Sequence, residues 1–232
     1  MLEWILRSNL KIQIKNASDW IIYNDIFVDG EYDPAIYPLM LNLSEHNQLQ
    51  VLDIGANVGF FTIRVFDLLI RNGFTPDQVF INLFEASPRI CQDLSERLID
   101  INNLGNFIQI HNGLVGQREG SAKFSELEFT GMSGIYTGSE NANTQEINFI
   151  DVENILDGDT RISLLKCDIE GSELMFLENY PSLMKRVDSA VFELHPNYCD
   201  ISKCMDLIRE SGLSNYEILR ELSYLSVIYF WR

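Results

Sequence analysis

The chain has 232 residues, 46% of them hydrophobic and 11% aromatic, which is enough to fill the core of one sizeable α/β domain. Its 17 basic and 34 acidic residues give a formal net charge of −17 at pH 7. Such a surface repels a phosphate backbone and offers no cationic groove for counterion release, so it disfavours a nucleic-acid substrate.

The first 48 residues are predicted to form an N-terminal lid. They alternate only weakly in hydropathy and are rich in Tyr, Asp and Trp, which favours short strands and one helix at Pro34–Asn42. We therefore divide the chain into a lid segment at residues 1–48 and a main domain at residues 49–232.

The main domain is predicted to open with a strand, a tight turn and a helix. Leu49–Ile54 is a compact apolar run that leads into a glycine loop, and apolar residues with helical spacing follow over Phe60–Ile70. The pattern returns at Val79–Phe84, and a third strand is expected at Phe107–His111. Apolar strands that alternate with helices predict a doubly wound parallel sheet covered on both faces.

The second half of the main domain resumes this alternation after a polar stretch. That stretch is rich in Gly, Ser and Asn and predicts an inserted hairpin around Gly131–Thr144, close to the site. A fourth strand is expected at Ile162–Asp168, a fifth at Ser189–Leu194, and a helix at Cys199–Glu210.

The chain ends in two β-rich runs, Tyr216–Leu222 and Leu225–Trp231, which a short turn would join. A parallel α/β sheet that finishes in a C-terminal antiparallel hairpin is typical of class I methyltransferases rather than of nicotinamide dehydrogenases. The predicted fold class is therefore α/β: a Rossmann-like, doubly wound, mostly parallel sheet with this hairpin, plus the N-terminal lid.

The strongest motif is the glycine loop Val51–Gly59, at the carboxyl end of the first strand, where doubly wound folds bind ligands. Gly55 permits a sharp turn with the backbone close to a ligand, and Gly59 lets the helix start near the strand. The carboxylate of Asp53 suits a ligand with an ammonium group, such as the methionine part of S-adenosylmethionine, and suits a pyrophosphate badly. Asn57 stands where a dinucleotide fingerprint needs glycine.

Glu85 ends the second strand beside this loop. An acid at that position can accept two hydrogen bonds from the vicinal hydroxyls of a ribose. The alternative is a solvated acid ahead of a helix start, where acids are common.

Three carboxylates crowd the turn after the fourth strand, in the segment Lys166–Glu173. We expect Asp168 near the transferable methyl group and Glu170 near the substrate, whereas Glu173 at the helix start is interpreted only as a partner of the helix dipole. The alternative is that all three are capping or solvated acids.

Glu193 and His195 end the fifth strand and point to the same side of it, because side chains alternate along a strand. A histidine can deprotonate a hydroxyl, and a nearby acid would orient its ring and raise its basicity. A purely structural histidine is the alternative. These two residues could also hold a metal ion together with Asp168 and Glu170, but active-site acids explain the same pattern, so no metal is predicted.

Four segments resemble the FkbM-type S-adenosylmethionine-dependent methyltransferases. They are Asp53–Gly59, Phe84–Pro88, Lys166–Glu173 and Glu193–His195, which together span roughly residues 49–195. The third is the most diagnostic, since the family typically reads Asp-Val-Glu-Gly-Ala-Glu there. Ile169 and Ser172 are small departures from that pattern.

The resemblance implies S-adenosylmethionine as cofactor and assigns residues to it. Its methionine end would be held by Asp53, Gly55, Asn57 and Gly59, its ribose by Glu85, and its adenine by Asn112 and Gly113. The family methylates oxygen, and in some pathways side-chain amide nitrogen, on sugars, macrocycles and peptides. Its motifs do not name the acceptor.

The function expected is methyl transfer to a hydroxyl of a sugar, natural product or other small molecule, with His195 removing the proton, assisted by Asp168, Glu170 or Glu193. One alternative is N-methylation of a side-chain amide in a peptide. Another is a non-catalytic cofactor-binding module that docks a partner protein.

The remaining features concern setting and assembly. Four cysteines without a C-x-x-C pair favour a reducing, cytoplasmic setting. We expect no signal peptide and no membrane insertion, since the apolar stretch Val58–Ile70 is broken by polar residues and is shorter than the roughly 20 residues that a span needs. Aromatic residues in the N-terminal segment favour a homodimer.

Overall fold

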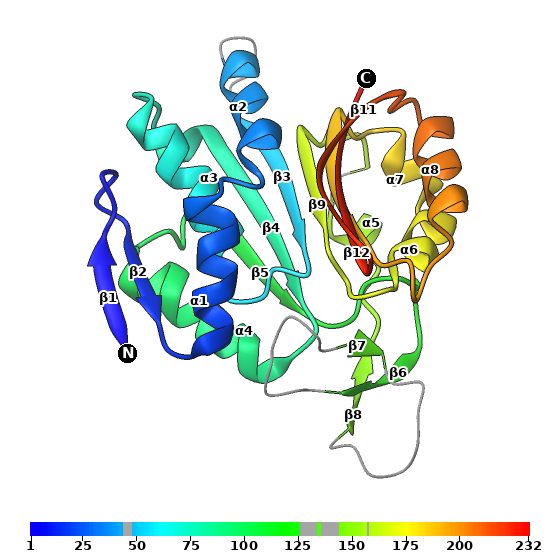
Figure 1. Ribbon diagram of the computed structural model, residues 1–232, viewed down its shortest axis with the longest axis horizontal. Helices are drawn as coiled ribbons and strands as arrows, with labels where there is room; N and C mark the ends of the chain where they lie inside the picture. The colour runs from blue at the N-terminus through cyan, green and yellow to red at the C-terminus, as the bar shows by residue number, and fades with distance from the viewer. Residues whose placement is uncertain (44–47, 126–133, 136–143, 157) are drawn as a thin grey trace.

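A seven-stranded sheet forms the centre of the protein in a computed structural model, which describes residues 1–43, 48–125, 134–135, 144–156 and 158–232 (Figure 1). The strand order is β11-β12-β10-β9-β3-β4-β5. These strands are β3 (Leu49–Ile54), β4 (Val79–Glu85), β5 (Ile108–Asn112), β9 (Leu164–Cys167), β10 (Ser189–Leu194), β11 (Asn215–Leu222) and β12 (Leu225–Trp231). The neighbouring pairs from β10 to β5 are parallel, and β12 runs antiparallel to both β10 and β11. The predicted fold class is confirmed.

Both faces of this sheet are covered. Leu49 and Val51 of β3 belong to one hydrophobic core, and Leu52 and Ile54 of the same strand belong to another. Successive side chains of a strand point to opposite faces, so the two cores lie on opposite sides of the sheet. Because both faces are buried, the inner parallel strands are mostly apolar, whereas the edge strand β5 contains three polar residues.

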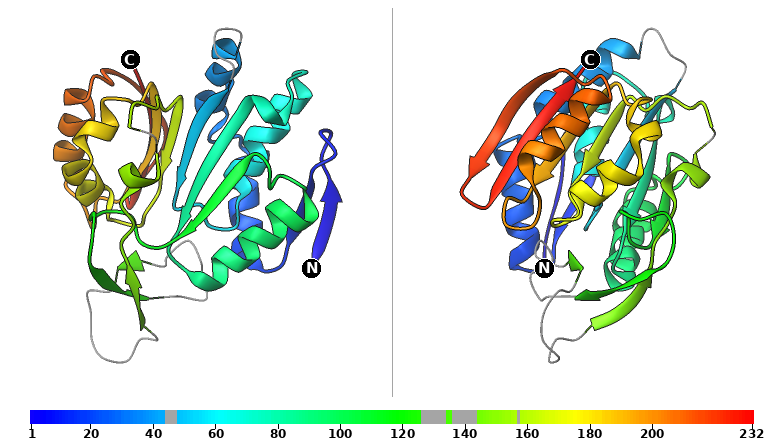
Figure 2. Two further views of the ribbon diagram at one scale, coloured as in Figure 1. Left: turned by 180° about the vertical axis from the view of Figure 1, so that it is seen from behind. Right: turned by 90° about the vertical axis from the view of Figure 1, so that its right-hand side faces the viewer.

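Helices make up the two outer layers (Figure 2). One layer contains α3 (Phe60–Arg71) and α4 (Pro88–Ser95), which continues as a π-helical turn at Glu96–Ile101. The other contains α5 (Val152–Ile155), α6 (Glu173–Asn179), α7 (Pro181–Met184) and α8 (Ile201–Glu210). Outside these layers, a 3₁₀ turn at Pro76–Gln78 leads into β4. The predicted N-cap is confirmed, since the Ser87 side chain accepts a hydrogen bond from the Ile90 amide at 3.1 Å.

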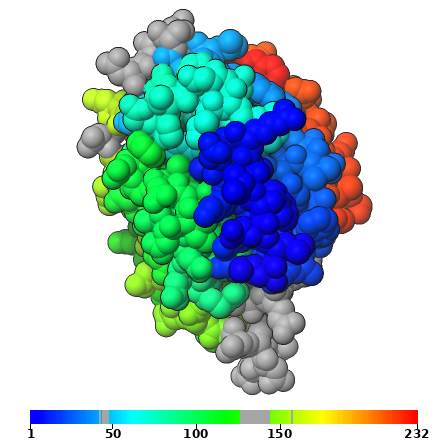
Figure 3. All heavy atoms as spheres, turned by 90° about the vertical axis from the view of Figure 1, so that its left-hand side faces the viewer, coloured from blue at the N-terminus to red at the C-terminus, as the bar shows by residue number. Residues whose placement is uncertain are grey.

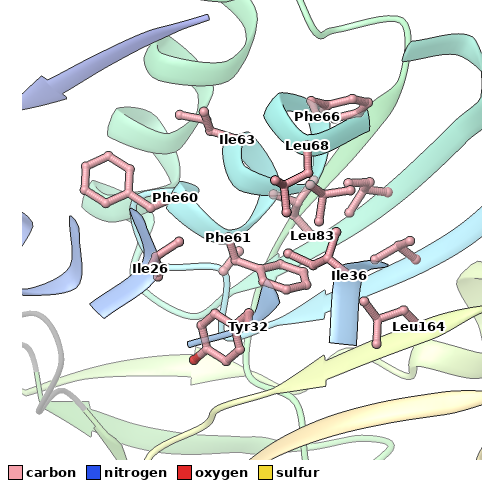
Figure 4. Packing of buried hydrophobic residues seen from close by; sticks show 14 of the residues in the cluster. Ile26, Tyr32, Ile36, Phe60, Phe61, Ile63, Phe66, Leu68, Leu83 and Leu164 are labelled. Carbon is pink, nitrogen blue, oxygen red and sulfur yellow. The ribbon is translucent and has the colours of Figure 1, made fainter. Parts of the chain in front are cut away.

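The N-terminal segment adds a hairpin and two helices to the first layer. It consists of β1 (Leu2–Ile5), β2 (Lys11–Ile14), α1 (Ala17–Tyr23), a π-helical turn at Asn24–Val28 and α2 (Asp33–Asn42). In Figure 3 its blue surface lies directly against the cyan and green segments that follow in the chain. Its described residues 1–43 share a core with α3 (Figure 4), and its role as a lid stays a prediction.

A buried ion pair also fixes this segment. Arg97, 2% exposed, donates to the carboxylate of Asp19 in α1 at 2.7 Å, and Asp19 is 0% exposed. The same arginine pairs with Asp93 at 2.9 Å. The N-terminal segment is therefore tied to the main domain by charge as well as by apolar contact.

A small antiparallel sheet follows β5, at the lower end of the main sheet in Figure 1. It consists of β6 (Ser121–Ser125), β7 (Gly134–Ile135) and β8 (Thr144–Asn148). The pairing of β6 with β8 places the flanks of the predicted insertion side by side. Most of the predicted hairpin at Gly131–Thr144 lies outside the described residues.

Candidate functional site

A pocket that is partly open to solvent lies at the carboxyl ends of β3, β4, β5 and β9. Its lining consists of Gly55, Asn57, Phe84, Glu85, Ala86, Ile90, Gly113, Leu114, Val115, Phe124, Asp168, Ile169, Glu170 and Ser172. Six of the residues proposed from the sequence are among them. The pocket therefore stands where the strand order of a doubly wound sheet reverses, which is the usual ligand site of such folds.

Gly55 is required by the close packing of the glycine loop. Its φ is +76°, and a Cβ atom at this position would lie 1.7 Å from the carbonyl oxygen of Asp168. The amides of Gly55 and Ala56 both donate to the carbonyl oxygen of Phe84 at 2.9 Å. The loop is thus held between β4 and the turn after β9, with its backbone exposed to the pocket.

Asp53 is completely buried and is not part of the pocket lining, so its predicted contact with the cofactor stays a prediction. Its carboxylate accepts from the Thr62 hydroxyl at 2.9 Å and lies 3.7 Å from the ammonium of Lys166. The register of β3 and β9 places these two charged residues opposite each other. Burial raises the pKa of Asp53, although Lys166 and Thr62 oppose the shift.

Lys166 supplies the cation at the base of the loop, a role that the sequence did not suggest. Its ammonium donates to the carbonyl oxygen of Gly55 at 2.6 Å and lies 3.4 Å from the carboxylate of Asp168. Burial opposes the charged form, but the carboxylates of Asp168 and Asp53 outweigh it and raise the pKa of Lys166. A lysine is rarely buried without an acidic partner, so Lys166 inside the apolar strand Leu164–Cys167 could have indicated this ion pair.

Glu85 lines the pocket and braces the loop. One carboxylate oxygen accepts from the Asn57 amide at 2.9 Å and the other from the Ser87 amide at 2.8 Å. Burial raises the pKa of Glu85 to about 7 in spite of these bonds. Each oxygen retains a lone pair, so a ribose hydroxyl could still donate to it.

The two residues expected beside an adenine differ in position. Gly113 lines the pocket, and its amide donates to the Glu85 carbonyl oxygen at 3.0 Å. Asn112 is not in the lining, because its side chain donates to the carbonyl oxygens of Glu85 and Ala86 at 2.9 and 3.0 Å. Asn112 thus holds the end of β4 in place. Gly59 also stands outside the lining, where a Cβ would lie 2.6 Å from Leu94 in α4.

The four proposed catalytic residues converge at the ends of β9 and β10. Ligand-type atoms of Asp168, Glu193 and His195 all lie within 4.8 Å of one another, and a Glu170 oxygen lies 3.4 Å from Nε2 of His195. Burial, followed by the charge of Asp168, raises the pKa of Glu170 and of Glu193. Asp168, Glu193 and His195 could also coordinate a cation. That methyl transfer proceeds without a metal ion stays a prediction.

His195 is 8% exposed and is surrounded by carboxylates. Its Nδ1 lies 3.1 Å from an oxygen of Glu173. Burial lowers the pKa of His195, but the hydrogen bond to Glu173 and the charges of Glu173, Asp168 and Glu170 outweigh it and raise the pKa to about 9. The interpretation of Glu173 as a partner of the helix dipole alone was therefore incomplete.

A sequence model of the FkbM methyltransferase domain matches residues 53–224, well over half of the 232-residue chain. The chain belongs to the FkbM methyltransferase family. The family is S-adenosylmethionine-dependent, so the predicted family, enzyme class and cofactor are confirmed. No curated protein sequence gives a significant match.

Solved methyltransferase structures share the fold at low identity. The FkbM methyltransferase of Methylobacillus flagellatus KT is 16% identical, with a TM-score of 0.51 over 80% of this chain; the match spans 44% of that protein. Magnesium protoporphyrin IX methyltransferase of Synechocystis PCC 6803, solved with S-adenosylmethionine, is 13% identical, with a TM-score of 0.52 over 97% of this chain and 88% of its own. The N-terminal domain of human METTL16, solved with S-adenosylhomocysteine, is 11% identical, with a TM-score of 0.51 over 99% and 87%.

The N-terminal segment of this FkbM methyltransferase contributes one aromatic residue, Tyr32, to the surroundings of the site. The Tyr32 hydroxyl donates to the carboxylate of Glu193, and the Tyr32 ring packs edge-on against Phe61 at 5.3 Å. Figure 4 shows these two rings together.

Within the described part of this methyltransferase, no helix has both the length and the apolar character to cross a membrane.

Proposed function

We propose that this FkbM methyltransferase methylates a hydroxyl group of a sugar, natural product or other small molecule, with His195 as the general base. The observation that carries the proposal is the position of His195. Its Nε2 lies 3.4 Å from Glu170, which lines the pocket together with Asp168. A base at this position is within reach of an acceptor that approaches the methyl group from the β10 side.

The cofactor is proposed to occupy the pocket between the glycine loop and Glu85. Gly55 and Asn57 line the pocket, and in this proposal they hold the methionine end. Glu85 presents oxygens to the ribose hydroxyls, and Gly113 flanks the adenine side. In this proposal Asp168, which lines the pocket, would lie near the sulfonium, where a carboxylate favours the positive charge.

The chemical step is an in-line displacement. S-adenosylmethionine, when bound, would supply the methyl group to the acceptor oxygen and become S-adenosylhomocysteine, with the electron pair of the broken carbon–sulfur bond remaining on sulfur. The hydroxyl proton passes to Nε2 of His195, which accepts it only when the ring is neutral. Holding the donor and the acceptor together supplies much of the rate.

The test is a His195→Ala variant assayed with methyl-labelled S-adenosylmethionine and a panel of small-molecule hydroxyl and peptide amide acceptors. We expect label to enter hydroxyl compounds with the wild-type protein. The variant is expected to lose about 10²-fold or more in turnover while its S-adenosylmethionine affinity stays unchanged. Labelling of amides alone, or full turnover by the variant, would contradict the proposal.

A further inference from the structure

Glu173, the first residue of α6, is completely buried at the turn after β9. One of its oxygens, Oε1, lies near three donors. The amide of Gly171 donates to it at 3.0 Å, the amide of Ile169 at 3.3 Å, and Nδ1 of His195 lies at 3.1 Å. The two amides fix the carboxylate in place, and an ionised carboxylate can only accept hydrogen bonds. Nδ1 of His195 must therefore carry a proton.

The geometry points to Glu173 as the positioning residue of this site, which keeps the proton of His195 on Nδ1 and so leaves the lone pair for the methyl acceptor on Nε2. This inference rests on the proposed function, in which His195 is the base. Nε2 is the ring nitrogen that lies 3.4 Å from Glu170 on the pocket side. A neutral ring with its proton on Nδ1 has its lone pair on Nε2, and that lone pair takes the acceptor proton.

A purely structural role does not account for the carboxylate at this position. The second oxygen of Glu173, Oε2, is buried and has no hydrogen-bond partner among the described residues. A buried, incompletely paired carboxylate is costly, and a neutral glutamine could accept from the two amides equally well. The charge becomes useful when His195 takes up a proton, because the imidazolium and the carboxylate then neutralise each other.

The other groups that face His195 are also acidic. Asp168 and Glu170 follow the end of β9, and Glu193 belongs to β10, directly before the histidine. The backbone amide of Cys199 donates to the carbonyl oxygen of His195 at 2.9 Å. Among the acids of the described residues, Glu173 alone contacts Nδ1, so its effect on the ring can be separated from that of the others.

The test compares wild type with Glu173→Gln, which keeps an oxygen for the two amides and removes the charge. The matched control is Glu178→Gln in the same helix, an exposed side chain that pairs with Lys203 on the surface. The protein is labelled with ¹⁵N at histidine. Because the chain has three histidines, the ring signals of His195 are identified as those that disappear in His195→Gln. The ring ¹⁵N shifts then report the tautomer and the pKa of His195.

We expect the wild-type ring above its pKa to carry the proton on Nδ1. Glu173→Gln should lower the pKa of His195 by about one unit or more, and Glu178→Gln should not move it. An unchanged pKa in Glu173→Gln would overturn the inference. So would a wild-type ring with its proton on Nε2, which is readable even if the variant does not fold. Neither measurement needs an acceptor, so failure of the proposed methyl transfer, seen in the His195→Ala assay, is a separate result.

Discussion

The charge state of a single side chain, His195, sets the expected pH dependence of methyl transfer. Its pKa is raised to about 9, because the hydrogen bond to Glu173 and the nearby carboxylates outweigh the effect of burial. The base is the neutral ring, whose fraction grows about tenfold per pH unit below the pKa. The rate at saturating cofactor should therefore rise from pH 7 to about 9 and then level off. A rate that is flat over this interval would remove His195 as the base.

Gly55 is the residue at which the site tolerates least change. In Gly55→Ala the new methyl group meets the Asp168 carbonyl oxygen at 1.7 Å, at a φ of +76°. We expect this variant to lose about 3 kcal/mol of unfolding free energy and its S-adenosylmethionine binding. Gly73→Ala is the matched control, since Gly73 has a φ of +86° but nothing within 4 Å of a new Cβ. Urea unfolding of both variants is the measurement, and equal losses would show that the contact with Asp168 does not matter.

The sequence predicted residues of the site where they stand at the end of one strand or in one turn. It did not predict contacts between residues from distant segments. Glu85, Asp168 and Glu170 line the pocket as expected, since strand ends are readable from apolar runs. The partners of Asp53 and Glu193 were not predictable in this way. Lys166 meets Asp53 through strand register, and Tyr32 meets Glu193 across 161 positions of sequence. Such contacts depend on how distant segments pack.

The elements themselves follow the same rule. Three strands have the predicted bounds, Leu49–Ile54, Ser189–Leu194 and Leu225–Trp231, because turn residues stand directly beside their apolar runs. The fourth strand is shorter than predicted, Leu164–Cys167 instead of Ile162–Asp168. Ile162 forms only an isolated bridge with Val187, and Asp168 already belongs to the turn.

The attachment of α1 is an element-scale feature that can be tested. In Asp19→Asn the buried guanidinium of Arg97 loses its charged partner in α1 and keeps the carboxylate of Asp93 and the carbonyl oxygen of Gln13. Leaving a buried charge poorly paired costs about 3 kcal/mol, so the urea midpoint should fall markedly. Glu178→Gln breaks a surface pair with Lys203 and should leave the midpoint unchanged. A midpoint for Asp19→Asn equal to that of the control would contradict this account of how α1 is held.

At the scale of the whole molecule, the N-terminal segment is continuous with the main domain. Ile12, Ile36 and Leu39 are buried in the same core as Phe60 and Phe66 of α3. Sequence alone could not predict this, because the segment alternates weakly and its apolar residues find partners only through tertiary packing. The homodimer stays a prediction. Apolar side chains such as Leu2, Ile5 and Trp20 are exposed on this segment and could form the contact between two copies.

The central claim is that the pocket at the carboxyl ends of the strands holds S-adenosylmethionine, with Glu85 at its ribose. Isothermal titration calorimetry of wild type, Glu85→Gln and the control Glu178→Gln tests it most directly. The account predicts that wild type and the control bind with equal affinity. Glu85→Gln should bind about tenfold or more weakly, because the amide donates where a carboxylate oxygen accepts from the loop and the ribose. Equal affinity in all three proteins, or no binding by wild type, would contradict it.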